Sequence, residues 1–283
     1  MIITREKPQL LKDSMHLPTS SYNALLATLP FFSGRVAAAL NPSCRPGGNF
    51  DLSKWALETP IDNGNGQPLV ISAASLSAGN DGCKNGWQDK GSNHQWFFTE
   101  STDGSMVMKA PGYSKDRPCI KWSGSNHCRT EFRQTSPTSW PPSATTNRLH
   151  VKLVGIRGRN VCIGQVFQVG SSANKPFAEL YYYDDGTVIM GVATCQGGAN
   201  DGCKQHMEPL GTVALGTAFT YDIWFEGNVL KAGVNGQMKT LKTYFTTPGA
   251  MFKAGNYNQG TDDASVHILE LTTQHGGEEA SDL

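Results

Sequence analysis

Residues 127–133, with the sequence His-Cys-Arg-Thr-Glu-Phe-Arg, constrain the fold of this chain more than any other stretch. Ionisable side chains recur there with a period of two, so on a β-strand they would project from one face, each about 7 Å from the next. The four residues are His127, Arg129, Glu131 and Arg133. Burying any of them unpaired costs several kcal/mol, so they must pair with one another, meet water or meet a charged ligand. Taken alone, the strand is best interpreted as an exposed face with Arg–Glu pairs.

The composition indicates an all-β domain. Of 283 residues, 31 are glycine and 15 are proline, and no long run beyond about residue 60 has apolar residues at helical spacing. Short apolar stretches between frequent turn residues are typical of antiparallel strands. The charge is balanced, with 24 basic and 24 acidic residues, so no net field attracts nucleic acid or a membrane. Recognition of a charged partner must come from a local patch.

Short strands separated by turn signals are predicted from residue 50 to residue 271. The turns at 184–186 and 227–228 each predict a hairpin. We expect a β-jelly roll, two antiparallel sheets packed as a sandwich, in which one bent sheet offers a concave substrate cleft. No change of composition marks a second domain. We therefore predict a single domain at 40–275, followed by a disordered tail at 276–283.

Residues 1–39 differ from the rest of the chain. The apolar run at 24–32 is too short to span a bilayer, and Val36-Ala-Ala-Ala39 has the small residues of a signal-peptidase site. We interpret residues 1–39 as a secretion leader and expect a secreted, extracellular protein. Arg35 inside the segment argues against a leader, and an amphipathic N-terminal helix packed on the domain is the alternative.

The seven cysteines agree with an oxidising compartment. Cys119 and Cys128 flank one short loop, Cys195 and Cys203 flank another, and we expect a disulfide to close each loop. The odd count leaves at least one thiol free, for which we choose Cys162 in an apolar Val-Cys-Ile run. We find no paired Cys-x-x-Cys and no histidine cluster that would support a zinc site.

Three segments carry the signal for function. They are Arg129-Thr-Glu-Phe-Arg133, Gly164-Gln-Val166 and Met251-Phe-Lys-Ala-Gly-Asn-Tyr-Asn-Gln259. Together they resemble the signature segments of the alginate lyase 2 superfamily, polysaccharide lyase family seven. Those segments are an Arg-[Ser/Thr]-Glu-x-Arg strand, a Gln-[Ile/Val]-His strand and a Tyr-Phe-Lys-Ala-Gly-x-Tyr-Asn-Gln strand. The resemblance extends from residue 50 to about residue 271. It implies a β-jelly roll that cleaves uronic-acid polysaccharides by β-elimination.

The chemistry of that reaction suits the residues present. Elimination at a 4-linked uronate removes the C5 proton next to a carboxylate, so donors aimed at the carboxylate stabilise a dianionic intermediate. Arg129 is suited as a bidentate clamp and Gln165 as a neutral donor. Tyr257 stands where the family uses a tyrosine to move the proton. Its pKa, about 10 in a free side chain, would have to be lowered, and Lys253 and Arg129 are the candidate cations.

Other residues are expected to line the same cleft. One strand face would hold Lys253, Gly255, Tyr257 and Gln259. The glycine would leave room for a sugar ring above the backbone. Glu131 is expected to orient Arg129 or Arg133 by a salt bridge rather than to act as a base. The predicted substrate-binding residues are Arg133, Lys253, Gln259, Glu131 and Phe167.

Phe167 departs from the family pattern, which has histidine at this position. A phenyl ring can neither accept a proton nor donate to a carboxylate. His127 is the expected substitute, because strand alternation puts it on the face of Arg129, and we expect its imidazole beside Gln165 and Tyr257. Weaker candidates are His94, His150 and His206.

The leading hypothesis is a secreted polysaccharide lyase with alginate, and within it polymannuronate, as first substrate. Glucuronan is second, because its carboxylate and C5 proton pose the same problem. The predicted catalytic residues are Tyr257, His127, Gln165 and Arg129. The missing histidine motivates an alternative, a non-catalytic homologue that binds acidic polysaccharides. A glycoside hydrolase is a third hypothesis and would need two facing carboxylates.

We expect a monomer whose chemistry uses no cofactor and no metal ion. A structural calcium ion is left open, with Asp184-Asp185 or Asp262-Asp263 as ligands. Neither pair has the spacing of a calcium loop.

Overall fold

The computed structural model describes residues 39–77, 79, 82–89, 95–116, 118–171, 174–198 and 202–276, all within a compact unit that begins at Ala39. The predicted leader, apart from Ala39, lies outside the described residues. The same holds for His94 and for residues 277–283 of the predicted tail.

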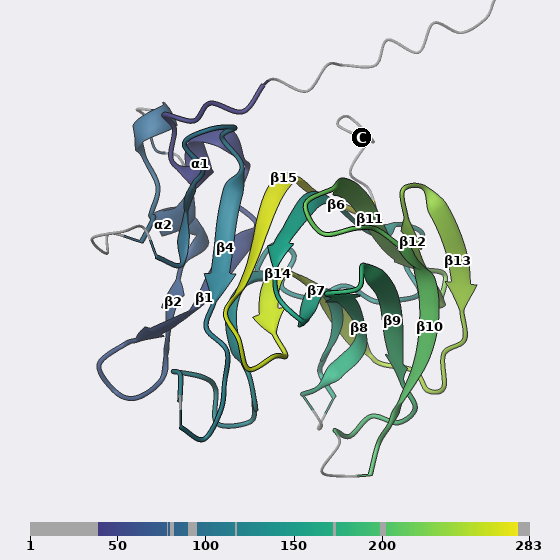
Figure 1. The fold of residues 1–283 in the computed structure, drawn as a ribbon. Coiled ribbons are helices and arrows are strands. Elements are labelled where there is room, and N and C mark those ends of the chain that lie inside the picture. Colours follow the sequence, from purple (N-terminus) through teal and green to yellow (C-terminus); the bar gives the residue numbers. More distant parts are fainter. Residues whose placement is uncertain are drawn as a thin grey trace, which may run out of the picture. The chain divides into compact units, whose positions relative to one another are not determined.

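Two antiparallel sheets make up the unit (Figure 1). The strand order of the eight-stranded sheet is β10 (Gln205–Thr212), β9 (Thr187–Ala193), β8 (Pro176–Tyr183), β7 (Asn160–Val169), β14 (Gly249–Asn258), β5 (Cys128–Gln134), β1 (Trp55–Asp62) and β2 (Pro68–Ile71). The order of the seven-stranded sheet is β13 (Gln237–Leu241), β12 (Val229–Val234), β11 (Ala218–Glu226), β6 (Asn147–Arg157), β15 (Ala264–His275), β4 (Met106–Ala110) and β3 (Phe97–Thr99).

The helices of the described residues are short: α1 (Pro46–Asn49), α2 (Ala73–Leu76) and the 3₁₀ helix η1 (Gly82–Lys84). None of them has the length and apolar character needed to cross a membrane.

This architecture confirms the predicted all-β sandwich. The turns at 184–186 and 227–228 join β8 to β9 and β11 to β12 as antiparallel hairpins. The first strand, β1, contains Pro60 and continues past it to Asp62. Proline cannot donate to a strand ladder, and a register shift between Glu58 and Asp62 accommodates it.

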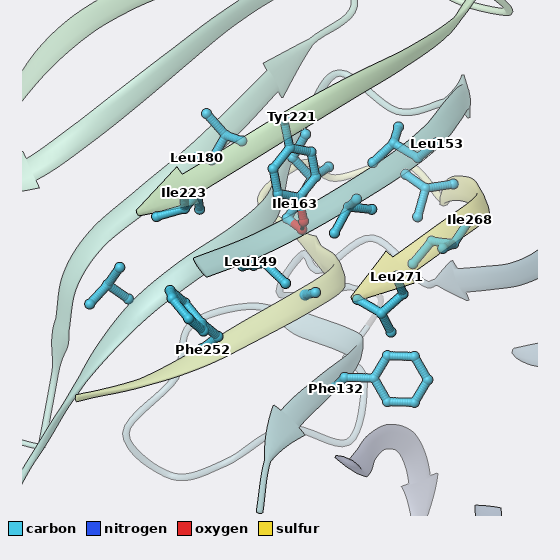
Figure 2. Packing of buried hydrophobic residues seen from close by; sticks show 14 of the residues in the cluster. Phe132, Leu149, Leu153, Ile163, Leu180, Tyr221, Ile223, Phe252, Ile268 and Leu271 are labelled. Carbon is cyan, nitrogen blue, oxygen red and sulfur yellow. Dashed lines mark hydrogen bonds between the residues drawn. The ribbon is translucent and has the colours of Figure 1, made fainter. Parts of the chain in front are cut away.

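The core lies between the two sheets, and alternation along β5 places one face of that strand in it (Figure 2). Phe132 of β5, Ile163 of β7 and Phe252 of β14 are fully buried there. Tyr221 of β11 reaches them from the opposite sheet and donates a hydrogen bond of 2.6 Å to the Ile163 carbonyl. Truncating a buried aromatic side chain costs about 3–5 kcal/mol. The strands that carry the charged face are thus anchored through their other face.

Disulfides join Cys44 to Cys83, Cys119 to Cys128 and Cys195 to Cys203. The two predicted loop-closing bonds are confirmed. The third links the start of the unit to η1. Cys162 is the free cysteine and is buried in β7, as predicted.

Gly255 marks an irregularity in β14. The pairing of β14 with β7 shifts register between Ala254 and Tyr257, and Gly255 within this shift has a φ of 135°. Residues other than glycine rarely adopt this backbone conformation. A Cβ at this position would lie 2.6 Å from Met108 Cε and 2.9 Å from the Thr130 carbonyl oxygen. The predicted role of Gly255, room for a sugar ring, is therefore wrong, because Met108 of the opposite sheet fills the space.

Gly255→Ala is expected to destabilise the domain by at least about 1–3 kcal/mol through backbone strain, and contact with Met108 adds to this. A domain of this size loses about 2–4 °C of melting temperature per kcal/mol, so thermal unfolding followed by circular dichroism detects the change. Gly124→Ala is the control, because a Cβ at Gly124 has open space around it. Equal losses in the two variants would contradict the argument.

Candidate active site

A cleft of about 1040 Å³ lies on the face of the eight-stranded sheet turned away from the core. Side chains of β1, β5, β14, β7 and β8 form its floor. Both short disulfide-closed loops line it as well, the first through Trp122 and Ser125 and the second through Gly197 and Gly198. The predicted concave cleft is thus present on the sheet that holds the charged strand.

Strand pairing brings the three motif segments together in this cleft. Lys253 lies opposite Arg133 on one side and opposite Gln165 on the other. Tyr257 lies opposite Arg129. The predicted site residues that line the cleft are Arg129, His127, Gln165, Tyr257, Arg133, Lys253, Gln259 and Phe167. Glu131 is fully buried and does not line the cleft itself. It contacts Arg129, Lys253 and Gln165, which do.

A buried ion cluster forms the floor around Glu131. One oxygen of this carboxylate accepts from Arg129 Nη1 at 2.8 Å and from Lys253 Nζ at 3.2 Å. The other accepts from the amide of Gln165. The interpretation of this strand face as exposed is wrong, whereas the expected Arg–Glu pairing is present. The charges can be buried because they satisfy one another.

Glu58 of β1 is a member of the cluster that sequence reasoning missed. It accepts from Lys253 Nζ at 2.9 Å and from Arg129 Nη1 at 3.4 Å, and Arg133 Nε lies 3.7 Å away. In the sequence Glu58 has no charged residue at i±2, and only the pairing of β1 with β5 places it opposite Glu131. Burial alone would raise the pKa of Glu58, but Lys253 and Arg129 hold it below its usual value. The carboxylate is therefore ionised at neutral pH.

Arg129 is immobilised within the site. Its guanidinium carbon lies 3.8 Å from the centroid of the Tyr257 ring, and Nη2 donates to Ser125 Oγ at 3.2 Å. Its side chain is 9% exposed. The positively charged guanidinium is therefore stacked on the phenol ring in a defined position. Its role as a bidentate clamp on substrate stays a prediction.

The hydroxyl of Tyr257 lies 2.9 Å from Ser125 Oγ. Ser125 already donates its own hydrogen to the His127 carbonyl, so the phenol is the donor in the bond between them. Burial raises the pKa of Tyr257 above its usual value of 10.0, and Arg129 and Ser125 offset this only in part. The expected lowering of this pKa is wrong, because desolvation outweighs the nearby cation. Tyr257 is a neutral phenol at neutral pH.

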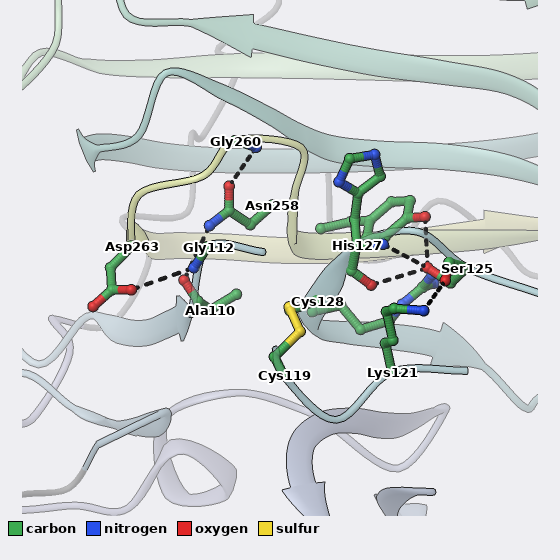
Figure 3. The surroundings of a disulfide bond; sticks show 12 residues. Ala110, Gly112, Cys119, Lys121, Ser125, His127, Cys128, Asn258, Gly260 and Asp263 are labelled. Carbon is green, nitrogen blue, oxygen red and sulfur yellow. Dashed lines mark hydrogen bonds between the residues drawn. A yellow bond between two sulfur atoms is a disulfide. The ribbon is translucent and has the colours of Figure 1, made fainter. Parts of the chain in front are cut away.

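His127 stands beside Tyr257, with 5.9 Å between ring centroids and 77° between ring planes. Figure 3 shows His127 and Ser125 next to the disulfide between Cys119 and Cys128. Burial lowers the pKa of His127 below its usual value of 6.5, and the positive charge of Arg129 lowers it further. The imidazole is therefore neutral at neutral pH and can accept a proton.

Phe167 and Gln259 complete the cleft near β14. Lys253 Nζ lies 5.3 Å from the centroid of the Phe167 ring. Gln259 Nε2 donates to the Tyr257 carbonyl at 3.1 Å. Phe167 thus places an apolar ring where a family histidine would carry a proton.

The weaker histidine candidates lie elsewhere. His150 of β6 is on the other sheet, where its Nδ1 lies 2.8 Å from Asp222. His206 of β10 is exposed and does not line the cleft.

Metal ligands do not converge within the described ranges, where no three His, Cys, Asp or Glu side chains gather around one point. Among the acidic residues considered for calcium, Asp185 accepts from the Thr187 amide at 2.8 Å. Asp262 lies 3.8 Å from Arg159 Nε.

Known structures share this fold. The crystal structure of alginate lyase A1-II', a member of polysaccharide lyase family 7, superposes with a TM-score of 0.65 at 23% identity, over 82% of this chain and 99% of that one. The Klebsiella pneumoniae alginate lyase structure gives 0.65 at 21% identity, over 82% and 99%. A variant of A1-II' in complex with its product GGG gives 0.66 at 22% identity, over 82% and 100%.

The match of a family model to most of the chain defines a polysaccharide lyase that acts on uronic-acid polymers. A family model described as alginate lyase matches residues 50–275, so the chain belongs to that family. An alginate lyase from Klebsiella pneumoniae is 24% identical in an alignment that covers 90% of this chain and 98% of that protein.

Stability at acid pH is expected to depend on Glu58. Because its folded-state pKa is depressed, Glu58 stabilises the domain above its unfolded-state pKa of about 4.3, and this stabilisation is lost as the pH falls through the folded-state pKa. Removing one member of a buried ion pair costs about 3–5 kcal/mol. Glu58→Gln should therefore be less stable by this order at neutral pH and should lose less stability on acidification.

Urea unfolding at a series of pH values measures both effects. Glu226→Gln is the matched control, because its ion pair with Arg148 on the other sheet is partly exposed, with side chains 19% and 33% accessible. Such pairs contribute about 0–1 kcal/mol. A pH dependence of Glu58→Gln that parallels the parent protein would contradict the role of Glu58.

Proposed function

We propose that the protein cleaves polymannuronate by β-elimination, with His127 as the base and Tyr257 as the acid. The observation that carries this proposal is the contact between the two rings, whose centroids are 5.9 Å apart in the cation-floored cleft. Burial lowers the pKa of the imidazole and raises that of the phenol, so both are neutral at neutral pH. Two groups whose environments push their pKa values apart are suited to act as base and acid.

The cleft floor supplies positive charge for the uronate carboxylate. Arg129 and Lys253 are held in place by buried glutamates before substrate arrives, and Arg133, the third cation of the floor, has 41% of its side chain exposed. The Gln165 amide has a second hydrogen beyond the one given to Glu131. Fixed donors of this kind stabilise the charge that develops when C5 loses its proton.

In the proposed step the imidazole of His127 takes the C5 proton. The electrons of the C5–H bond form the C4–C5 double bond, and the C4–O4 bond breaks. Tyr257 gives its proton to the leaving O4 oxygen. Return of a proton from the imidazolium to the phenolate, directly or through water, restores both groups.

The position of the two groups selects the sugar. Adjacent side chains act on one face of a ring, and in mannuronate and glucuronate the C5 hydrogen and O4 share a face. In guluronate, the C5 epimer of mannuronate, they lie on opposite faces and need proton carriers on both sides. Phe167, at the family histidine position, cannot serve as a second base. The arrangement favours polymannuronate first and glucuronan second.

We also propose that the protein acts outside the cell. Disulfides persist in oxidising compartments, and two of those present close loops that line the cleft. The apolar run at 24–32, followed by small residues at 36–39, supports export.

Polymannuronate should be the fastest substrate, followed by glucuronan, with polyguluronate at least about tenfold slower. For guluronate one of the two proton carriers lies on the wrong face of the ring, and a general acid or base contributes about 10²–10⁴-fold. Initial rates follow from the ultraviolet absorbance of the unsaturated product. A preference for polyguluronate would contradict the same-face arrangement of His127 and Tyr257.

Tyr257→Phe and His127→Ala should each lower kcat for polymannuronate by about 10²–10⁴-fold, the usual contribution of a general acid or base. Binding of a mannuronate tetramer, measured by titration calorimetry, should change little. The acid limb of the kcat/KM profile should lie below pH 6.5, in line with the lowered pKa of His127.

Matched controls come from outside the cleft lining. Tyr244→Phe and His206→Ala remove the same groups at residues that do not line the cleft and should keep the parental rate. Full activity in His127→Ala would exclude His127 as the base. Partial recovery on adding Phe167→His to that variant would show that a base at either position serves.

A further inference from the structure

The cleft holds a second polar cluster that the proposed mechanism does not use. Glu179 and Tyr181 project from β8, and Gln205 reaches in from β10. The Tyr181 hydroxyl lies 2.9 Å from Glu179 Oε2 and 3.0 Å from Gln205 Oε1, and Gln205 Nε2 lies 2.6 Å from the same Glu179 oxygen. These three residues are termed the Glu179 cluster.

A glycine on the intervening strand allows this cluster to form. β9 runs between β8 and β10, and its Gly191 lies opposite Glu179 on one side and Met207 on the other. A Cβ at Gly191 would collide with the Gln205 amide. The missing side chain lets the amide cross β9 and contact β8.

The three contacts of the Glu179 cluster need three hydrogen atoms. The Gln205 amide supplies one of them and the Tyr181 hydroxyl one, since a phenol has a single O–H. If the phenol donates to the Gln205 oxygen, the remaining contact joins the phenol oxygen to Glu179 Oε2, and its hydrogen must come from Glu179. If the phenol donates to Glu179 instead, its contact with the Gln205 oxygen has no hydrogen of its own. Exchanging the nitrogen and oxygen of the amide leaves this count unchanged. All three contacts are satisfied only when Glu179 is a protonated, uncharged acid.

The charges of the cleft agree with a neutral Glu179. Arg129 and Lys253 pair with the other two buried glutamates, and among the residues that the structure describes no cation lies within ion-pair distance of Glu179. Burial raises the pKa of Glu179, and the charge of Glu131 raises it further, against the hydrogen bonds of its own cluster and against Arg129. Other titratable groups that face the cluster or share its cleft are Cys162, Tyr257, His127, Arg133, Lys175 and Lys204.

Glu179 stands next to the place where the uronate carboxylate is expected. It lies directly opposite Gln165 in the pairing of β7 with β8, and neighbouring strands are about 4.8 Å apart. Oε2 is occupied within the Glu179 cluster, whereas Oε1 has no hydrogen-bond partner among the described residues. With the proton on Oε2, Oε1 is a carbonyl oxygen that can only accept.

We propose that Glu179 binds a free hydroxyl of the uronate chain as an uncharged acceptor. This inference rests on the proposed function, because it takes the ligand to be a polyuronate seated at Gln165. An ionised carboxylate there would repel the carboxylate of the polymer, whereas the neutral acid accepts a hydroxyl hydrogen without that repulsion. Sugars whose hydroxyls are esterified cannot donate, so the site selects against an O-acetylated polymer.

Calorimetry of a mannuronate tetramer with the Tyr257→Phe protein tests the inference without turnover. Glu179→Ala should weaken binding about five- to tenfold, the loss of one hydrogen bond. In the Tyr257→Phe protein with Glu179 intact, here called the parent, the Kd for the tetramer should rise at alkaline pH as Glu179 ionises. Glu179→Gln, which keeps an uncharged acceptor, should hold the low Kd at every pH. A Glu179→Gln variant as weak as Glu179→Ala, or a parental Kd independent of pH, would overturn the proposal.

Two controls separate a hydrogen bond at Glu179 from an effect of net charge and from steric exclusion of acetyl groups. Glu208→Gln deletes a carboxylate on β10 at a residue that does not line the cleft, and it should retain the parental pH dependence. If it behaves like Glu179→Gln, the effect is one of net charge and the proposal is wrong. An O-acetylated tetramer should bind the parent about as weakly as it binds Glu179→Ala. Discrimination against it that survives in Glu179→Ala would also overturn the assignment.

Infrared spectroscopy of the free protein reads the proton directly. A protonated carboxyl band should be present at neutral pH and absent from Glu179→Gln, and the lack of such a difference would overturn the proposal. This readout needs neither ligand nor activity. If the band and the tetramer binding behave as expected but polymannuronate is not cleaved, the proposed mechanism fails and the role of Glu179 stands.

Discussion

Three adjacent strands each place buried charge on one face of a sheet, and that face persists because each charge meets an opposite one. Glu58 and Glu131 lie side by side on β1 and β5, and both accept from Arg129 and Lys253. Removing any of the four would leave an uncompensated ion out of water. The other face of the same strands packs into an apolar core, so the cations cannot relax away. The cleft therefore has a rigid electropositive floor before any ligand arrives.

Buried glutamates in a cleft that binds a polyanion would repel it if they carried uncompensated negative charge. The fold removes this charge in two ways. Two of the carboxylates are neutralised by cations that they also hold in position. Glu179, the third, has hydrogen-bond partners in place of a cation and is best satisfied as an acid. The same balance of burial against charge sets the pKa values of the two neighbouring rings in the cleft. Burial raises the pKa of the Tyr257 phenol and lowers that of the His127 imidazole, which leaves both neutral side by side.

Much of this could be predicted from the sequence. Alternation along 127–133 identified the charged strand, turn residues identified hairpins, and the motif segments identified Gln165 and Tyr257 as cleft residues. Glu58 could not be found, because its partners are set by strand pairing across the sheet. Gly255 was misassigned because a register shift turns its missing side chain toward the core. The direction of the Tyr257 pKa shift depends on how deeply the ring is buried, which the local sequence pattern does not indicate.

The salt link between Glu58 and Lys253 joins residues 195 positions apart in the chain. During synthesis the early carboxylate emerges long before its ammonium partner, and the strand that carries Lys253 also inserts between β5 and β7 in the middle of the sheet. A partly made chain thus has neither a closed sheet nor a working floor. The cleft floor and the sheet beneath it are therefore completed only once the segment Gly249–Asn258 has been synthesised.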